Sequence, residues 1–477
     1  MTTVDPSTGD PSSAADVPVV DLSTARRVHV IGVGGSGMSA IATVLATMGH
    51  HVTGSDLRAS AGLERLEALG VTVAVGHDAA NLPADVELVT RSTAIPDRNP
   101  EVVEARTRGL DVLNRAAILG AIAAERRAVA VAGTHGKTTT SSMLALILVE
   151  AGLRPSFIIG GDVNAFGTGA VWDAGETMVV EADESDGTFV TLPRAAAIVT
   201  NIEPDHLEHW GGFDNLRASF VRFVTETDGP VVMGADDPIA AELAAETGAI
   251  TFGVVEGADY RMGPVARSRA GTAFSFSQRG IELGEIKVPV AGEYNARNAA
   301  AAAAMALELG APFAAAQAAM ARFAGVARRF QYRGEVRGVT FIDDYAHLPT
   351  EVADALSAAR DGEWDRVVCV FQPHRFSRTA ALWSTFGGAF MAADVLVVTD
   401  VYASGEAPRP GVSGKLIVDA VLDAHPRQRV VYLPHRADLV AFLGHELRSG
   451  DLCLTLGAGD LTTLPDELIP RMEPGAG

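Results

Sequence analysis

Residues 133–140 form a glycine-rich segment whose lysine and hydroxyl side chains are spaced for binding a phosphate. The segment follows an apolar run and opens a helical pattern, and its residues are Gly133, Thr134, His135, Gly136, Lys137, Thr138, Thr139 and Thr140. In such a loop the backbone N–H groups surround phosphate oxygens, the lysine reaches the β- and γ-phosphates, and the following threonine can ligate Mg²⁺. The first glycine lies too close to Gly136 for a standard Walker A motif. The chain has only three lysines, so Lys137 at this position predicts a nucleoside triphosphate site.

Two acidic segments end later apolar runs. Residues 181–186 carry four acids: Glu181, Asp183, Glu184 and Asp186. Carboxylate oxygens are hard ligands that suit Mg²⁺. A solvated loop is the alternative for this segment alone, but the phosphate loop in the same region favours the metal. Residues 200–206 (TNIEPDH) end another run, and His206 could bind a second divalent ion, with a structural histidine as the alternative.

A second glycine-rich turn, GVGGSG over residues 32–37, lies between a predicted strand and a predicted helix. Gly34 would let the backbone approach a diphosphate, which the N–H groups at the helix N-terminus would bind. Asp56 ends the next strand, about where an acid that binds ribose would fall, so the turn fits a nicotinamide dinucleotide. A different diphosphate, such as a nucleotide-sugar, and a tight turn without a ligand are the alternatives. The motif alone does not choose among them.

Polar clusters also follow two apolar runs near the C-terminus. They are DDYAHLPTE over residues 343–351 and FQPHRFSR over residues 371–378. Arg375 and Arg378 suit a carboxylate, because a guanidinium group binds planar anions in a bidentate manner. A solvated loop is the alternative for either cluster alone.

Three regions that alternate strand and helix patterns must position these residues, and they cover residues 26–116, 128–329 and 330 to the end. Their predicted strands are 27–33, 51–56, 128–133, 176–183, 195–201, 339–345, 366–372, 395–401, 430–433 and 451–457. Continuous β-branched runs of this kind are typical of parallel strands that are covered on both faces. Ligands of such sheets bind at the carboxyl ends of the strands, where the polar clusters lie. The sequence therefore predicts the α/β class.

Composition narrows the classes further. A length of 477 residues suggests about three domains of roughly 100–200 residues. The net charge of -21 disfavours non-specific binding to nucleic acid or anionic membranes. No apolar run reaches the roughly 18 residues of a membrane span. Residues 1–23 do not have the pattern of a signal peptide and are predicted to be a disordered tail. Cys369 and Cys453 lie in predicted buried strands, so no disulfide is expected.

These motifs, in this order, resemble those of the Mur ligase family. The most telling are HVIGVGGSGMSAIA, AGTHGKTTT, EADESD, TNIEPDHLEH, DDYAHLPTE, FQPHRFSRT, DVYASGE and GAGD, and the likeness spans residues 28–460. The first motif together with FQPHRFSRT is similar to the member that joins L-alanine to UDP-N-acetylmuramate, or to its tripeptide-recycling relative. The resemblance implies a cytoplasmic, ATP-dependent ligase of peptidoglycan precursor synthesis. Its substrates would be UDP-N-acetylmuramate, L-alanine and ATP, with two Mg²⁺ ions.

The resemblance also implies three domains after the tail. They are a Rossmann-like UDP-sugar-binding domain (24–117), a central P-loop ATPase-like domain with a mostly parallel sheet (118–329), and a Rossmann-like C-terminal domain for the amino acid (330–477). The UDP-sugar contacts would be Gly34, Gly35, Ser36, Gly37, Asp56, His77, Asn81, Ser92 and Thr93.

The resemblance assigns the remaining site residues to the other two domains. The ATP contacts would be Gly133, Thr134, His135, Gly136, Lys137, Thr138, Thr139, Asn295, Asn298, Arg329 and Asp344. The metal ligands would be Thr138, Glu181 and His206. The amino-acid site would hold Tyr345, His374, Arg375 and Arg378, and the catalytic residues would be Lys137, His347, Arg375 and Arg378.

The implied reaction has two steps. The lactyl carboxylate attacks the γ-phosphate to give an acyl phosphate and ADP, and the alanine amine then attacks the acyl phosphate and releases phosphate. Lys137 would spread the developing charge. A base or a phosphate oxygen must take the proton of the amine, and His347 is a candidate.

Four positions can be compared with the family pattern. The alanine-adding member usually has glycine where Ala346 stands and a second histidine where Leu348 stands, and DYAH is more similar to the diaminopimelate- or lysine-adding member. Because adjacent residues of an extended segment point to opposite sides, we expect Leu348 to point into the domain core and His347 to face the site. The alternative is that Leu348 lines the pocket, makes it more apolar and shifts the preferred amino acid. Tyr294 replaces a histidine beside the adenine. Phe220 stands where several other members carry a carbamylated lysine, as expected of the alanine-adding member.

Three other functions are compatible with parts of the sequence. The first is the tripeptide-recycling ligase. The second is an NAD-dependent oxidoreductase, which the first glycine turn and Asp56 suggest but which has no use for the phosphate loop. The third is a nucleotide-gated binding or scaffold protein without chemistry.

Overall fold

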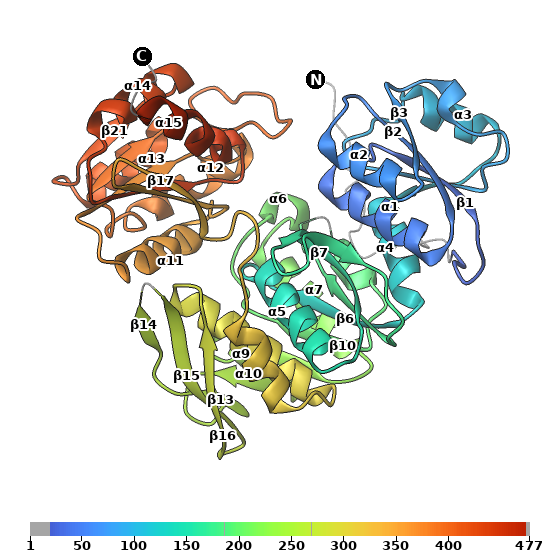
Figure 1. The fold of residues 1–477 in the computed structure, drawn as a ribbon, viewed down its shortest axis with the longest axis horizontal. Helices are drawn as coiled ribbons and strands as arrows, with labels where there is room; N and C mark the ends of the chain where they lie inside the picture. The colour runs from blue at the N-terminus through green and yellow to red at the C-terminus, as the bar shows by residue number, and fades with distance from the viewer. Residues whose placement is uncertain (1–19, 186, 269, 474–477) are drawn as a thin grey trace, which may run out of the picture.

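The computed structural model describes residues 20–473, apart from residues 186 and 269. The chain forms three α/β domains, each built on its own sheet. The N-terminal domain (blue) and the C-terminal domain (orange to red) lie on either side of the central one (Figure 1). This architecture confirms the predicted fold class. No helix in the described part of the chain is long and apolar enough to cross a membrane.

Most of the predicted N-terminal tail, residues 1–19, lies outside the described residues. Its last four residues are described, and Leu22 is buried in the core of the N-terminal domain. Leu22 therefore belongs to the folded domain and not to the predicted tail.

The N-terminal sheet has five parallel strands in the order β3-β2-β1-β4-β5. The strands are β1 (Arg27–Ile31), β2 (His51–Asp56), β3 (Thr72–Val75), β4 (Leu88–Arg91) and β5 (Val112–Asn114). The helices are α1 (Ser36–Met48), α2 (Ala61–Ala68), α3 (Pro100–Thr107) and α4 (Arg115–Ala124). Because β2 and β4 flank β1, the glycine turn after β1 lies where the strand order reverses, which is the usual ligand position of such sheets.

The central sheet is the largest, with the order β14-β15-β13-β12-β11-β10-β6-β9-β7-β8 and with β16 beside β15. Its strands are β6 (Arg127–Ala132), β7 (Ser156–Val163), β8 (Thr168–Val171), β9 (Thr177–Glu181), β10 (Ala196–Val199), β11 (Val231–Gly234), β12 (Ile250–Gly253), β13 (Tyr260–Met262), β14 (Ala266–Ser268), β15 (Gly271–Gln278) and β16 (Ile281–Val288). Neighbouring strands pair in parallel along the stretch β13-β12-β11-β10-β6-β9-β7 of this order. The strands β8, β14, β15 and β16 pair antiparallel with their neighbours.

Helices cover the central sheet, and they are α5 (Lys137–Glu150), α6 (Leu207–Trp210), α7 (Phe213–Thr225), α8 (Pro238–Thr247), α9 (Glu293–Glu308) and α10 (Phe313–Ala321). The apolar strand β6 and the alanine-rich α9 are almost wholly buried. Small alanine side chains let α9 lie close to α5, the helix that carries the phosphate loop at its N-terminus.

The C-terminal sheet has the order β17-β18-β22-β19-β20-β21 and is parallel except for β17. Its strands are β17 (Gln331–Val336), β18 (Val339–Asp344), β19 (Arg366–Phe371), β20 (Val395–Val398), β21 (Val430–Tyr432) and β22 (Asp451–Leu456). Its helices are α11 (Pro349–Arg360), α12 (Phe376–Leu382), α13 (Lys415–Ala424), α14 (Arg436–Glu446) and α15 (Leu464–Met472). Both cysteines are buried and free, as predicted.

Candidate active site

The phosphate loop joins the buried strand β6 to helix α5. Gly133 and Gly136 both have positive φ, of 126° and 80°. A Cβ on Gly136 would lie only 2.4 Å from Asn298 Oδ1, and one on Gly133 only 2.2 Å from Thr200 Oγ1. Only glycine fits these positions, and the loop consequently presents the N-terminus of α5 to a ligand.

Lys137 begins α5 and forms an ion pair inside the loop. Its Nζ lies 2.9 Å from Glu184 Oε2 and donates to Gly133 O at 2.7 Å. Burial by itself would lower the pKa of Lys137, but the carboxylates of Glu184 and Asp183 outweigh it and raise the pKa above its usual value. The ammonium group is therefore charged and held at the loop, where a phosphate can replace the carboxylate.

Oxygen donors for a divalent cation lie beside this lysine. Thr138 and Glu181 line a cleft of about 1130 Å³ together with Lys137. The described residues contain no group of three or more His, Cys, Asp or Glu side chains that is already arranged around a metal ion. Mg²⁺ usually binds through one or two carboxylates, substrate phosphates and water, so Thr138 and Glu181 fit the ion in the presence of a nucleotide.

His206 fits a metal less well as it is placed. Its Nε2 lies 3.2 Å from Arg378 Nη2 and 3.2 Å from Asp205 Oδ2. A cation at Nε2 would have to displace the guanidinium group. Asp186 of the acidic segment lies outside the described residues.

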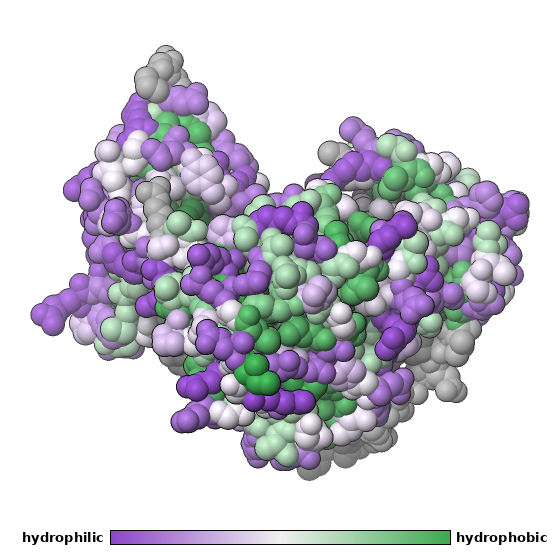
Figure 2. Space-filling view, turned by 60° about the horizontal axis from the view of Figure 1, so that its bottom comes forward, coloured by the Kyte–Doolittle hydropathy of each residue, from purple (hydrophilic) through white to green (hydrophobic). Residues whose placement is uncertain are grey.

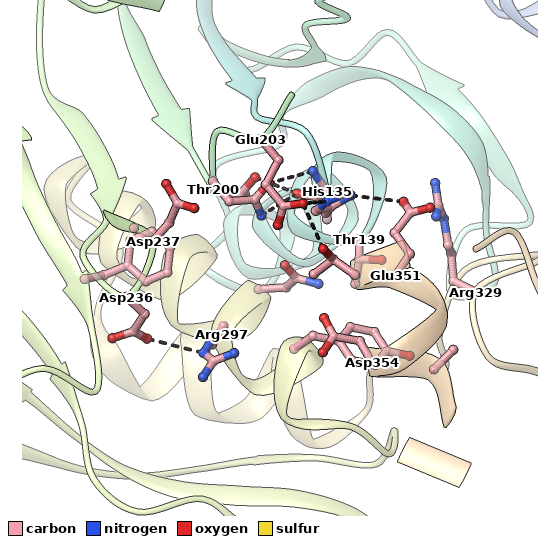
Figure 3. Close-up of a pocket in the computed structure, with 18 of the residues that line it drawn as sticks. His135, Thr139, Thr200, Glu203, Asp236, Asp237, Arg297, Arg329, Glu351 and Asp354 are labelled. Atoms are coloured by element: carbon pink, nitrogen blue, oxygen red, sulfur yellow. Dashed lines mark hydrogen bonds and ion pairs between the residues drawn. The ribbon is translucent and has the colours of Figure 1, made fainter. Parts of the chain in front are cut away.

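A smaller cavity of about 360 Å³ lies beside the phosphate loop, between the central and C-terminal domains (Figure 3). Its lining includes the predicted ATP contacts His135, Gly136, Thr139, Asn298, Arg329 and Asp344. Thr134 supports the loop from behind, where its N–H donates to Asn201 O at 3.1 Å. Asn295 is not among the lining residues, and its amide donates to Ala291 O at 2.6 Å. Tyr294, which the family pattern places beside the adenine, lines the cavity, and so does Arg297, to which the sequence gave no role.

Asp344 connects this cavity to the hinge between the two domains. Its two oxygens accept from the backbone N–H groups of Phe330 and Ala346, each at 2.7 Å. Burial raises the pKa of Asp344 to about 6, although the positive charge of the nearby Arg329 acts to lower it. Both hydrogen bonds hold the end of β18, from which Tyr345 and His347 follow.

The C-terminal residues expected at the amino-acid site lie together in the large cleft: Tyr345, His347, His374, Arg375 and Arg378. The rings of His347 and His374 are 5.6 Å apart. Burial lowers the pKa of His347 to about 4 and that of His374 to about 3, so both are neutral near pH 7. Arg378 also lies 3.2 Å from Asp205 of the central domain.

Leu348 is placed differently from our expectation. It is buried, but it lines the same cleft as His347 instead of packing into a core cluster of the C-terminal domain. Leu348 precedes α11 with a backbone that is still extended (φ -104°, ψ 154°), so the alternation of side chains along the segment did not keep it out of the cleft.

The N-terminal glycine turn reaches the cleft through Gly34 and Ser36. Gly35 precedes α1, and Gly37 lies in its first turn, against the guanidinium group of Arg115. Asp56 accepts a hydrogen bond from Gly34 N at 2.9 Å, so it holds the turn. The sequence gave no role to Arg115, because a single arginine at the start of α4 belongs to no motif.

The remaining predicted UDP-sugar contacts lie around the same strand ends. His77 Nδ1 and Asn81 Nδ2 lie 3.3 Å and 2.9 Å from Glu101 Oε1. Ser92 follows β4 and packs beside the turn at Gly32, and Thr93 next to it is exposed. Glu101, a buried carboxylate at the start of α3, was not predicted as part of this group.

In the space-filling view the molecule is hollowed between its two outer lobes (Figure 2). Residues of all three domains line the large cleft, and their charges suit phosphates and a carboxylate. Three parts of the chain match known domains: residues 27–127 match the Mur ligase family catalytic domain, 131–306 the Mur ligase middle domain, and 328–459 the Mur ligase, glutamate ligase domain. The chain belongs to the Mur ligase family, which confirms the resemblance seen in the motifs.

Individual relatives narrow the comparison. Proteins named UDP-N-acetylmuramate–L-alanine ligase from Pelotomaculum thermopropionicum and Anaeromyxobacter dehalogenans are each 45% identical, over 94% of this chain and 98% and 99% of theirs. The crystal structure of UDP-N-acetylmuramate–alanine ligase from Thermotoga maritima is similar with a TM-score of 0.79 at 31% identity, covering 94% of this chain and 99% of that one. The crystal structure of a murein peptide ligase from Psychrobacter arcticus is similar with a TM-score of 0.70 at 25% identity, and the match covers 94% of this chain and 98% of that one.

Proposed function

We propose that this chain is an ATP-dependent ligase that forms the amide between the lactyl carboxylate of UDP-N-acetylmuramate and L-alanine. One observation carries the proposal: a single cleft is lined by the glycine turn of the N-terminal domain, the phosphate loop and the arginines of the C-terminal domain. A nucleotide-sugar, a triphosphate and a carboxylate can therefore meet in one place. The names of the relatives that are 45% identical over nearly the whole chain support this reaction.

In the first step the lactyl carboxylate attacks the γ-phosphorus of ATP, and ADP leaves. Phosphorylation is needed because a carboxylate does not react with an amine at neutral pH. The charged Lys137 and the N–H groups at the start of α5 stabilise the charge that develops on the phosphate oxygens. Arg329, whose Nη2 lies 3.5 Å from Thr138 Oγ1, is placed to bind the same phosphate group.

In the second step the neutral amine of alanine attacks the acyl phosphate. A tetrahedral intermediate forms and then expels phosphate, which keeps the oxygen that bridged carbon and phosphorus. His347 lines the cleft with a neutral ring and is the candidate acceptor of the amine's proton, although burial lowers its pKa to about 4 and makes it a weak base; a phosphate oxygen is the alternative acceptor. Arg375 and Arg378 supply positive charge for the carboxylate groups of the reactants.

Mg²⁺ would be held by Thr138 and Glu181 and would neutralise charge on the phosphates of bound ATP. We place no second ion at His206, because Arg378 occupies the space at its Nε2. In this arrangement Arg378 supplies the positive charge there. The proposed setting for the reaction is the cytoplasm.

The tripeptide-recycling ligase is the second candidate, because a murein peptide ligase shares the fold at a TM-score of 0.70. Purified protein with ATP and UDP-N-acetylmuramate would be offered L-alanine or the tripeptide, and phosphate release would be followed. Our proposal predicts a specificity constant for alanine that is at least 100-fold higher. A preference for the tripeptide would overturn it.

The ligand of the N-terminal glycine turn can be tested separately by calorimetry. We expect heat of binding from UDP-N-acetylmuramate and none from NAD. Heat from NAD alone would replace the nucleotide-sugar assignment by that of a dinucleotide.

A further inference from the structure

Glu351 lies in the wall between the nucleotide cavity and the large cleft. It belongs to the first turn of α11 in the C-terminal domain, and it is among the residues that line both hollows. Its side chain is only 13% exposed. Its two carboxylate oxygens contact different partners.

The first oxygen faces the phosphate loop. Glu351 Oε1 lies 3.3 Å from His135 Nδ1, while the other ring nitrogen of His135 lies 3.1 Å from Glu203 Oε2 (Figure 3). Burial by itself would lower the pKa of His135, but the two carboxylates outweigh it and raise the pKa to about 10. Both ring nitrogens thus carry protons and lie within ion-pair distance of a carboxylate, one from each domain, so the charged His135 side chain helps to dock the two domains.

The second oxygen faces the amino-acid site. Glu351 Oε2 accepts from the backbone N–H groups of His347 at 2.9 Å and Leu348 at 3.1 Å. It also lies 3.3 Å from His347 Nδ1, which is 3.1 Å from the carbonyl oxygen of Tyr345. Since both neighbours of Nδ1 are acceptors, Nδ1 must carry the proton of the neutral ring. Nε2 is then the free acceptor that a base requires.

We propose that Glu351 is a positioning residue that fixes the phosphate loop and the His347 ring in one geometry and thereby couples the two half-sites. The inference rests on the proposed function, because it treats the cavity and the cleft as parts of one reaction. Glu203 adds a second link between the same domains, where Thr350 Oγ1 donates to Glu203 Oε2 at 2.8 Å. Glu351 alone touches both His135 and His347 among these groups.

The Glu351→Gln variant tests the inference, because an amide keeps the size and can still accept from the backbone N–H groups that begin α11. We expect kcat to fall about 10- to 100-fold and KM for ATP and alanine to rise, with KM for UDP-N-acetylmuramate unchanged. The matched control is Glu363→Gln, an exposed glutamate just beyond the end of α11, which should leave all constants unchanged. If Glu351→Gln kept normal kcat and KM values and only its melting temperature fell, Glu351 would act merely as a cap of α11, and the proposal would be overturned.

Two further readouts separate coupling from stability. A double-mutant cycle of Glu351→Gln with His135→Gln should be strongly non-additive in kcat, whereas additive losses would contradict the coupling. Nitrogen-15 NMR of the imidazoles should show His347 with its proton on Nδ1 in the unaltered protein and a mixture of tautomers in Glu351→Leu, because leucine removes the side-chain acceptor that an amide would keep. An unchanged tautomer would refute the positioning role. The NMR spectrum is recorded without turnover, so it tests the positioning role independently of the proposed reaction. If the proposed reaction itself were wrong, the unaltered protein would release no phosphate.

Discussion

At the scale of single residues, Lys137 carries the charge that the first chemical step needs. Its ammonium group forms an ion pair with Glu184, and both side chains are largely buried. The ion pair offsets the cost of burying the charged ammonium group.

Lys137→Ala should lower turnover on the order of 10²–10³-fold or more, because the phosphate loses a preorganised charge. The fold should remain, since burial raises the pKa of Glu184 to about 7 and the unpaired carboxyl can take up a proton. Steady-state phosphate release and a melting curve would be measured. Lys287→Ala, at a lysine that is 69% exposed, is the control and should be neutral. Near-normal turnover of the alanine variant at position 137 would remove the phosphate-loop assignment.

His347 and Leu348 are neighbours with different expected roles. His347→Ala should lower the rate strongly, since the candidate base is lost. Leu348→His should leave the ranking of alanine, serine and glycine unchanged if Leu348 only closes the wall of the cleft. Specificity constants for the three amino acids in both variants would decide. A changed ranking in Leu348→His, with little effect of His347→Ala, would transfer the selective role to position 348.

The sequence predicted the positions of some site residues better than those of others. Lys137 and Arg378 follow strands β6 and β19, and Arg329 lies just before β17; all three line the hollows in which the proposed reaction takes place. Asp56 and Asn295 contact backbone instead, and short-range motifs do not reveal which way a side chain turns. The dual contact of Glu351 depends on two domains meeting, which no local pattern encodes.

At the scale of elements, a buried carboxylate ties α3 to three strands of the N-terminal sheet. Glu101 accepts from His29 on β1, Ser55 on β2 and Asn81 after β3. Despite burial, which raises its pKa, these donors lower the pKa of Glu101 to about 2. The carboxylate therefore stabilises the arrangement of strand ends around the glycine turn.

Glu101→Gln should destabilise the N-terminal domain in a pH-dependent way. A pKa lowered from 4.5 to about 2 corresponds to about 3 kcal/mol of stability. Because the folded-state pKa is the lower one, this stability is present above about pH 4.5 and is lost as the pH falls toward 2. Denaturant unfolding of both proteins should show a gap near pH 7 that narrows below pH 4.5. Glu104→Gln on the same helix is the control, and an equal gap at every pH would contradict the network.

The strands that carry the motifs were predictable from the sequence, whereas β3–β5, β7, β8 and β11–β17 were not predicted. The strand ends that carry the motifs, such as those of β6 and β19, are continuous apolar runs, and the structure confirms them. The antiparallel strands β14–β16 were not predicted, since β14 is wholly exposed and β16 is exposed along much of its length. A strand that is covered on only one face does not have the continuous apolar run of a parallel strand that is buried on both faces.

At the scale of the whole molecule, the reaction depends on three domains meeting at one cleft. Contacts such as Arg378 with Asp205 and Glu351 with His135 join the C-terminal domain to the central one. Each domain supplies one reactant site, so the chemistry requires them to be held together. The order of the motifs along the chain predicted the domains, whereas the contacts between them required the structure.

The central claim is that ATP activates the lactyl carboxylate as an acyl phosphate, and transfer of an oxygen isotope tests it most directly. UDP-N-acetylmuramate labelled with oxygen-18 in that carboxylate would be turned over with ATP and L-alanine, and the released phosphate would be analysed by mass spectrometry. The mechanism predicts one labelled oxygen in each phosphate, because the bridging oxygen leaves with phosphorus. Phosphate without label, or label in AMP, would contradict it.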